Sequence, residues 1–460
     1  MASLPPVPVY PGKGLGIIPL GSSLHHILNL LKQHPSHFTS ISAVYDPSSP
    51  VTLPILILLD NNGLRLRFDG PDQRLRLIEI IDFTKCRPTY QSGDLTHQPA
   101  STHNPGTSNP TFKNIYHKLF GPTFSGKYLA SESLYVLSYP GVSFSLPVDR
   151  KSWREDVDFV SQLTSGTITS MAIYSGRSWS DVCDDLFSRP MNAPRVPTNT
   201  LAAARASSAN DEVELVIIRD NGVIELSRRC NPPLIITLHA TTPQDIVTEL
   251  GLPSSIYRKS DQRLNIHRAG VASLPEREES EPDNPPSEDD DERVESDDSG
   301  DGDFFLNYFN QGFDILISAQ RSAYHPVVTK LIIHGNVPGS HVFQRYRRCR
   351  WIVDLPEVQR SGSSDTTPGS GDNVSPLQIN SEESFVEMKK KLRKRFGEVG
   401  KPMPYSRGND SPSSSCELLG GWEDGGGSAT FGNTELYGFS GMVFEVLKNK
   451  GSSVTGLTVF

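Results

Sequence analysis

The sequence predicts an α+β fold of about four repeated strand–helix–strand–strand–strand modules, in which antiparallel sheets are interrupted by disordered insertions. Three observations predict this fold. A glycine followed by alternating apolar residues occurs four times, a helical segment precedes each copy, and a second apolar strand follows each copy. Alternation with a period of two places one face of a strand on a core and the other on solvent or a second layer. Modules of this kind stack antiparallel sheets against helices.

The strands that begin after a glycine are the clearest repeated element. The glycine suits a turn that demands positive φ. We predict these strands at 63–68, 141–146, 312–317 and 441–446, and the strands that follow them at 75–80, 168–174, 327–334 and 454–460. Four copies in the same order indicate an internal repeat.

A helix is predicted before each pair of strands. The four helices are predicted at 23–32, 112–120, 243–250 and 384–396. The third has the clearest boundaries, because Thr242 can cap it, Pro243 suits its first position and Gly251 can end it. In two copies an apolar strand comes before the helix, at 15–20 and 234–239.

Stretches rich in Ser, Gly, Pro, Asn and Asp separate these elements and predict loops or disorder. They are residues 91–110, 190–210, 267–303, 356–382 and 404–430. We therefore predict four regions. They are an N-terminal lobe of two modules (1–176), a central module with an extra hairpin and the insertion 267–303 (177–354), a disordered linker (355–383), and a C-terminal module (384–460).

The negative charge of the chain is concentrated in one insertion. Residues 276–303 contain fifteen acidic and two basic residues, so the rest of the chain carries +4 although the whole chain carries −9. Such a block cannot bury enough apolar surface to fold and repels itself. Ser287 and Ser296 each precede acidic residues, so we predict that acidophilic kinases phosphorylate them. The alternative is an inert, solubilising spacer.

The sequence does not indicate a catalytic, metal or cofactor site. The glycines of residues 11–16 are not followed by Ser or Thr and a helix, so we interpret them as a turn rather than a phosphate loop. His25 and His26 are adjacent on a predicted helix and point in different directions. The five cysteines are far apart and predict reduced thiols in the cytosol. We also expect no secretory signal and no membrane-spanning helix.

Two basic segments are candidate contacts for anionic ligands. The first is the helix 384–396, whose basic residues are Lys389, Lys390, Lys391, Arg393, Lys394 and Arg395. It could lie on an anionic membrane, or it could pack its apolar face in the core and leave its charges in solvent.

The second basic segment, 345–351, interleaves Arg345, Arg347, Arg348 and Arg350 with Tyr346 and Trp351. We predict a strand that could stack on bases or hold phosphorylated headgroups, or a half-buried strand with an exposed arginine face. No nucleic-acid partner is expected, because the sequence has no zinc, RRM or helix-turn-helix signature.

Several motifs resemble those of the phagosome assembly factor family. The residues that carry the resemblance are 11–16, 66–79 with 82–85, 242–253 with 257–260, 303–309 with 312–316, 337–339, 346–349 and 442–446. They occur in the same order and cover nearly the whole chain except the insertions. The acidic tract, the Ser/Gly stretch after Pro356 and the arginines of 345–350 depart from the family pattern.

The resemblance implies a non-enzymatic cytoplasmic adaptor in autophagy. Its partner would be a WD-repeat β-propeller, the protein called breast carcinoma amplified sequence 3, which contributes phosphoinositide binding. The pair would be recruited to the phagophore, the forming autophagosome. Two alternatives stay open: a vesicle-trafficking or Golgi/endosome-associated factor without an autophagy role, and an enzyme of unknown type.

Overall fold

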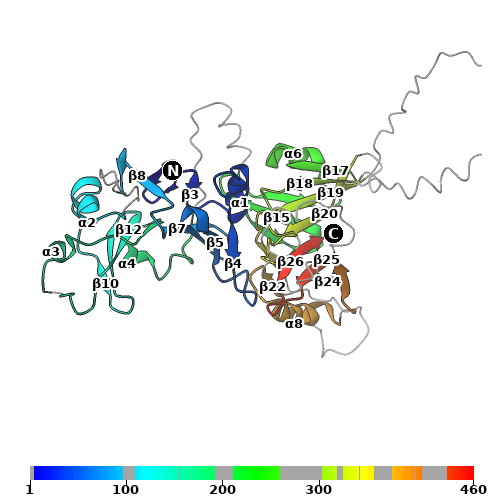
Figure 1. The fold of residues 1–460 in the computed structure, drawn as a ribbon. Helices are drawn as coiled ribbons and strands as arrows, with labels where there is room; N and C mark the ends of the chain where they lie inside the picture. The colour runs from blue at the N-terminus through cyan, green and yellow to red at the C-terminus, as the bar shows by residue number, and fades with distance from the viewer. Residues whose placement is uncertain are drawn as a thin grey trace, which may run out of the picture.

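The computed structural model describes residues 5–96, 109–154, 156–191, 211–258, 303–318, 325–340, 342–356, 376–398, 400–406 and 433–460. Figure 1 shows two halves side by side, the N-terminal half in blue to teal and the C-terminal half in green to red. Each half contains one five-stranded and one eight-stranded sheet. The predicted α+β class with antiparallel sheets is confirmed.

The N-terminal half is built from two sheets and short helices. The five-stranded sheet has the order β3-β2-β1-β8-β9 and contains β1 (Pro6–Tyr10), β2 (Gly14–Leu15), β3 (Ile18–Pro19), β8 (Arg87–Tyr90) and β9 (Gly93–Asp94). The eight-stranded sheet has the order β10-β11-β12-β13-β7-β6-β5-β4. Its strands are β4 (Ser42–Val44), β5 (Ile55–Leu59), β6 (Leu64–Phe68), β7 (Leu75–Ile80), β10 (Lys127–Leu129), β11 (Leu134–Tyr139), β12 (Val142–Pro147) and β13 (Ser170–Tyr174). The helices are α1 (Leu24–Gln33), α2 (Phe112–Asn114) with the π-helical turn η2 (Ile115–Leu119), α3 (Phe159–Leu163) and α4 (Trp179–Val182).

The C-terminal half has the same two kinds of sheet. The five-stranded sheet has the order β16-β15-β14-β21-β22 and contains β14 (Val213–Ile218), β15 (Val223–Arg228), β16 (Leu234–Thr237), β21 (Trp351–Leu355) and β22 (Leu377–Asn380). The eight-stranded sheet has the order β17-β18-β19-β20-β26-β25-β24-β23. Its strands are β17 (Ser255–Arg258), β18 (Phe304–Tyr308), β19 (Phe313–Ser318), β20 (Val327–His334), β23 (Met403–Ser406), β24 (Asn433–Phe439), β25 (Met442–Leu447) and β26 (Val454–Val459). The helices are α6 (Pro243–Leu250) and α8 (Phe385–Phe396).

The two halves share one strand order. In each eight-stranded sheet, two four-stranded meanders meet through their last strands, β7 with β13 and β20 with β26. Among the described strands of each five-stranded sheet, one pair is parallel, and it joins the first strands of the two modules, β1 with β8 and β14 with β21. The meanders have four strands each, one more than predicted after the helix, because a short edge strand opens each of them.

The predicted helices and main strands form close to where the sequence places them. The strands after Gly63, Gly141, Gly312 and Gly441 each begin one residue after the glycine, whose φ is positive. Helix α6 begins with the predicted cap, since the Thr242 side chain accepts from the Asp245 backbone N–H and the Asp245 carboxylate accepts in return. In place of one helix over 112–120, a single α-helical turn continues into a π-helical turn.

Each eight-stranded sheet is made of strands from two predicted modules. The segment predicted as a linker, 355–383, includes β22, which pairs with β21. Strand β26 of the last module pairs with β20 of the central module. Ser287 and Ser296 lie outside the described residues, as do residues 357–375 of the predicted linker. Each half has its own large hydrophobic core, formed between its sheets and helices.

Candidate interaction surfaces

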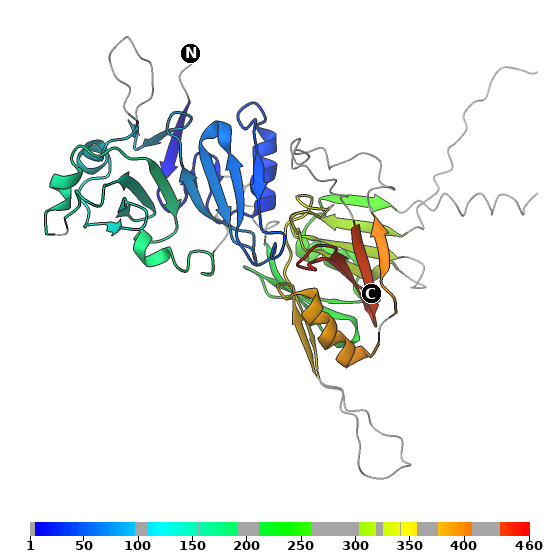
Figure 2. The same cartoon turned by 60° about the horizontal axis from the view of Figure 1, so that its bottom comes forward.

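The two halves meet mainly at two segments of the chain, and Asn449 Nδ2 of the C-terminal half also donates to the Pro47 carbonyl oxygen (3.1 Å). One is the turn between β6 and β7, and the other is the long linker 335–350 between β20 and β21. In Figure 2, α1 lies on the side of the N-terminal half that faces the C-terminal half. Gln73 Nε2 donates to the Asn336 carbonyl oxygen (2.9 Å), and Asn336 Nδ2 donates to Gln73 Oε1 (2.7 Å). Both side chains are buried and both residues have positive φ, so this amide pair joins two tightly turned segments.

Arg348 ties the linker to both halves. It is 3% exposed, and its guanidinium donates to three backbone carbonyl oxygens: Pro71 (2.7 Å), Gly335 (2.7 Å) and Ser381 (3.2 Å). Pro71 belongs to the N-terminal half, whereas the other two belong to the C-terminal half. The planar, five-donor guanidinium suits several acceptors that diverge in direction.

Arg350 makes the corresponding ionic contact at the rim of the junction. Its Nη1 lies 3.0 Å from Asp72 of the N-terminal half, and its Nε lies 2.8 Å from Glu382. About a third of the Arg350 side chain is exposed, so water weakens this pair relative to the buried contacts.

Three arginines from the two sides of the junction surround the Glu212 carboxylate. It pairs with Arg74 of the N-terminal half, and it lies 3.8 Å from Arg229 and 4.0 Å from Arg347. Burial alone would raise the pKa of the Glu212 carboxyl, but the surrounding arginines lower it below its ordinary value. Arg347 is itself buried and also donates to the carbonyl oxygens of Val213 and Gln311.

The prediction of a basic strand at 345–351 is therefore wrong. Of this segment only Trp351 lies in a strand, β21. Arg347 and Arg348 are buried, and Arg345 stacks over the rings of Phe309 and Tyr346 at 5.6 and 5.8 Å. The four arginines Arg345, Arg347, Arg348 and Arg350 face in different directions, because they follow a linker rather than a pleated strand. The buried pair presents no face to a base or a headgroup.

His25 of α1 packs against this linker. Burial lowers its pKa to about 4, a hydrogen bond with the Arg345 backbone acts in the opposite direction, and Arg347 lowers it further. The ring is therefore neutral near pH 7, and its Nε2 lies 3.0 Å from Asn29 Nδ2. The sequence does not indicate this contact of His25 with the other half of the molecule.

The motif at 66–79, which carries the family resemblance, builds the N-terminal side of the junction. The turn holds Asp72 and Gln73, and it is braced by the buried ion pair of Arg76 with Asp69. Asp69 also accepts from the Asp72 backbone N–H (2.7 Å). Burial raises the pKa of Asp69, and Arg76 opposes that rise.

The glycine-rich segment 11–16 forms the turn between β1 and β2, includes β2 itself and ends where the turn to β3 begins. Its Gly12 N–H donates to the Gly141 carbonyl oxygen (3.0 Å), and a Cβ on Gly141 would lie 2.1 Å from Gly12 N. Gly12 and Gly141 thus allow the two turns that hold them to come into contact. This agrees with the interpretation of residues 11–16 as a turn rather than a phosphate loop.

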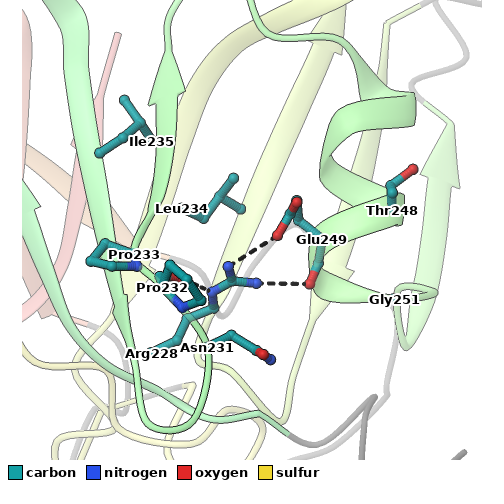
Figure 3. Close-up of a pocket in the computed structure, with 9 residues that line it drawn as sticks. All are labelled: Arg228, Asn231, Pro232, Pro233, Leu234, Ile235, Thr248, Glu249 and Gly251. Carbon is teal, nitrogen blue, oxygen red and sulfur yellow. Dashed lines mark hydrogen bonds and ion pairs between the residues drawn. The ribbon is translucent and has the colours of Figure 1, made fainter.

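A pocket of about 560 Å³ lies between the β15–β16 turn and the C-terminal end of α6 (Figure 3). Arg228 crosses it and pairs with the Glu249 carboxylate at 3.0 Å. Arg228 also donates to the carbonyl oxygens of Pro232 (2.7 Å) and Glu249 (3.1 Å). The two ionisable groups of the lining neutralise each other and leave no acid–base pair poised for catalysis. Among the described residues, no three His, Cys, Asp or Glu side chains are placed to hold a metal ion.

The residues that follow the pocket lining in the sequence carry exposed apolar side chains. Leu252 is 84% exposed, Ile256 57% and Tyr257 62%, and Ile235 at the pocket is 50% exposed. Ile256 and Tyr257 belong to β17, an outermost strand of its sheet. We call residues 252–257 the β17 edge. An edge strand presents unpaired N–H and C=O groups to a partner.

Helix α8 shows the predicted division between an apolar and a basic face. Phe385, Met388 and Leu392 are buried in the core of the C-terminal half, and Phe396 packs against it. Lys390, Lys391, Arg393 and Lys394 are exposed, whereas Lys389 and Arg395 are half-buried. Lys389 Nζ sits 4.5 Å from the centre of the Tyr437 ring, and Lys391 pairs with Glu383 at 2.8 Å. None of the described helices is long and apolar enough to cross a membrane.

The comparisons with known proteins agree on one family. A profile of the family described as phagosome assembly factor 1 matches residues 14–282 and 288–460, so the five unmatched residues between these ranges fall in the acidic insertion. A PHAF1 protein of Arabidopsis thaliana is 25% identical over 474 residues, which cover 98% of this chain and 92% of the relative. A PHAF1 protein of Drosophila melanogaster is 23% identical, with 96% and 90% covered. A PHAF1 protein of Caenorhabditis elegans is 25% identical, with 75% and 76% covered.

No solved structure matches this chain. The family profile covers nearly the whole sequence, including the motif that builds the junction and helix α8. The family is named for an assembly role, and no catalytic family is indicated. This chain belongs to the phagosome assembly factor 1 family.

Proposed function

We propose that this chain is a non-enzymatic, cytoplasmic adaptor in the assembly of the phagosome and the forming autophagosome. Its partner is a WD-repeat β-propeller, and the pair is recruited to the phagophore with membrane contact supplied mainly by phosphoinositide binding of the propeller. Family membership over nearly the whole chain supports the assembly role.

The observation that carries the adaptor role is the exposed β17 edge. Leu252, Ile256 and Tyr257 present large apolar side chains beside an open pocket. Strand β17 pairs with β18 along one edge and with no described strand along the other. Full burial of such a side chain contributes about 1.5–3 kcal/mol, so three of them supply a substantial part of a protein–protein affinity. Propeller blades are themselves four-stranded sheets, and an added strand is a common way for proteins to join.

The junction supports an adaptor in a second way. Buried contacts from Arg348 and from the Gln73–Asn336 pair fix the two halves against each other. A rigid body of two halves can hold one partner on one half while leaving the surfaces of the other half free for a second contact.

The test is affinity purification of the tagged protein from its own cells, fed and starved, with mass spectrometry of the eluate. We expect a stoichiometric WD-repeat propeller and starvation-induced puncta. Recovery of coat or tether proteins alone, unchanged by starvation, would contradict the proposal and favour the vesicle-trafficking alternative.

A variant of the β17 edge then tests the surface. In Leu252→Ser/Ile256→Thr/Tyr257→Thr we expect the propeller to be lost from the eluate, with an unchanged thermal midpoint because these side chains are exposed. Phe124→Ser, at a residue that is 93% exposed in the other half, is the matched control and should retain the propeller. Retention by the triple variant would move the partner to another surface.

A further inference from the structure

Helix α8 differs in charge from α6, the helix at the equivalent place in the same half. Each of the two helices precedes a four-stranded meander, α6 before β17–β20 and α8 before β23–β26. Helix α6 carries two acidic residues, Asp245 and Glu249, and no lysine or arginine. Helix α8 carries six basic residues and one acidic residue, Glu387. The fold tolerates either sign of charge at this place, so packing does not explain the basic residues.

The outward face of α8 is basic and poorly neutralised. Lys390 and Lys394 lie opposite the buried stripe formed by Met388 and Leu392, and Arg393 flanks this stripe, about 100° around the helix from Leu392. Lys390 reaches only Glu387, at 3.9 Å with both side chains largely exposed. Within the described residues, Arg393 and Lys394 have no carboxylate within ion-pair distance. We call Lys390, Arg393 and Lys394 the α8 basic face.

The fold also decides how this helix could meet a membrane. Three of the large apolar side chains of α8, Phe385, Met388 and Leu392, are already buried in the protein core, and Val386 is 53% exposed. Insertion of the kind made by free amphipathic helices is therefore excluded without unfolding α8 from its sheet. Contact through long, exposed basic side chains with anionic headgroups needs no such rearrangement.

We propose that the α8 basic face docks directly on an anionic lipid bilayer, as a peripheral and electrostatic contact. In Figures 1 and 2, α8 (orange) lies along the bottom of the C-terminal half. It is separated in the sheet order from the β17 edge, since β17 and the strand after α8, β23, are the two outermost strands of one sheet. Partner and membrane can therefore be bound at the same time. This inference goes beyond the proposed function, because it requires no propeller.

The test is co-sedimentation of the purified full chain with vesicles of phosphatidylcholine, with and without phosphatidylserine. Each basic side chain near an anionic surface contributes about 1 kcal/mol, or about fivefold in the partition coefficient. Charge removal in Lys390→Gln/Arg393→Gln/Lys394→Gln should therefore lower binding to the anionic vesicles about a hundredfold. Glutamine keeps a high helix propensity, so α8 should stay folded. Added salt should weaken wild-type binding, because these charges are exposed to solvent.

The matched control changes three exposed lysines of the N-terminal half, Lys113→Gln/Lys118→Gln/Lys151→Gln. It alters the net charge by the same amount and should keep wild-type binding. Thermal unfolding of both variants verifies that they are folded. Three results would overturn the proposal: no preference of the wild type for phosphatidylserine, equal losses in both variants, or undiminished binding by a folded α8 variant. The wild type could also fail to bind any vesicles while an acidic protein is lost from the cellular eluate of the α8 variant. That result would overturn the proposal and show that the α8 basic face binds a protein instead.

Discussion

Two linkers occupy the same place in the two halves of the molecule, and only the longer one reaches across to the other half. Residues 81–86 connect β7 to β8, and residues 335–350 connect β20 to β21. Each runs against the glycine that opens the third strand of its meander. A Cβ on Gly63 would lie 2.5 Å from the Asp82 carbonyl oxygen, and one on Gly312 would lie 2.3 Å from the Arg347 carbonyl oxygen.

The shorter linker stays on its own half. Thr84 is held by its own turn, through hydrogen bonds of its N–H and hydroxyl with the Asp82 carboxylate at 2.9 and 2.5 Å. Lys85 is about half exposed and donates to the Asp60 carbonyl oxygen (2.9 Å). In the longer linker, Arg347 and Arg348 are buried. The added length lets the chain leave its own sheet, and the guanidinium groups then satisfy carbonyls that the junction would otherwise bury without a donor.

The largest effect is expected for Arg348. In Arg348→Ala the carbonyl oxygens of Pro71, Gly335 and Ser381 lose their shared donor, so we expect the free energy of unfolding to fall by about 3 kcal/mol or more. Arg348→Lys should recover little of this, because an ammonium group cannot span the three acceptors. Denaturant unfolding of the full chain, followed by circular dichroism, measures the loss.

Lys85→Ala is the matched change in the shorter linker. It removes an exposed hydrogen bond, and we expect a loss within about 0.5 kcal/mol. Equal losses for Arg348→Ala and Lys85→Ala would show that the buried arginine does not stabilise the junction and would remove the contrast between the linkers.

The stability of the folded chain should also depend on pH through His25, which packs against the longer linker. Burial lowers the pKa of His25 to about 4 in the folded chain, whereas an unfolded histidine titrates near 6.5. Between these values the unfolded state binds more protons, so stability is fully present above pH 6.5 and falls as the pH drops towards 4. This difference between the folded and unfolded pKa of His25 corresponds to a loss of about 3 kcal/mol over this range.

His25→Gln should flatten this part of the stability profile, measured as the thermal midpoint from pH 4 to pH 7. His117→Gln, at an exposed histidine outside the junction, should leave the profile as in the wild type. If His25→Gln keeps the full pH dependence, other groups of the folded chain cause it and the contact of α1 with the linker is not pH-sensitive.

The main strands could be predicted from the sequence because their pattern is local. The glycine at positive φ and the alternation after it mark β6, β12, β19 and β25 within one residue. The edge strands that open the meanders, such as β4 and β17, were missed because they are three or four residues long and largely exposed. Too few buried side chains remain in them to produce a period.

The contacts of Arg348 could not be predicted, because its three acceptors are backbone carbonyls. A backbone carbonyl is present whatever the side chain, so the residue types at 71, 335 and 381 do not reveal that their oxygens accept from Arg348. The alternation of arginine with aromatic residues at 345–351 imitates a strand with a basic face, and nothing in it indicates that Arg347 and Arg348 are buried. The basic face of α8 was predictable, since a regular helix converts sequence spacing directly into direction.

A coupling energy smaller than the losses expected for Arg348 and His25 is expected for the amide pair between the halves, and it sharpens the comparison of the linkers. Gln73→Ala leaves the carbonyl oxygen and Nδ2 of Asn336 without their partner, and Asn336→Ala leaves Gln73 Oε1 without its donor, each at a cost of about 1–3 kcal/mol. The double variant removes both side chains, so we expect a coupling energy of about 1 kcal/mol from the double-mutant cycle. Thr84→Ala combined with Gln73→Ala is the matched cycle for the shorter linker, and its coupling should be near zero because no contact joins these residues in the described structure. Equal coupling in the two cycles would mean that the coupling of Gln73 with Asn336 does not arise from their contact across the junction.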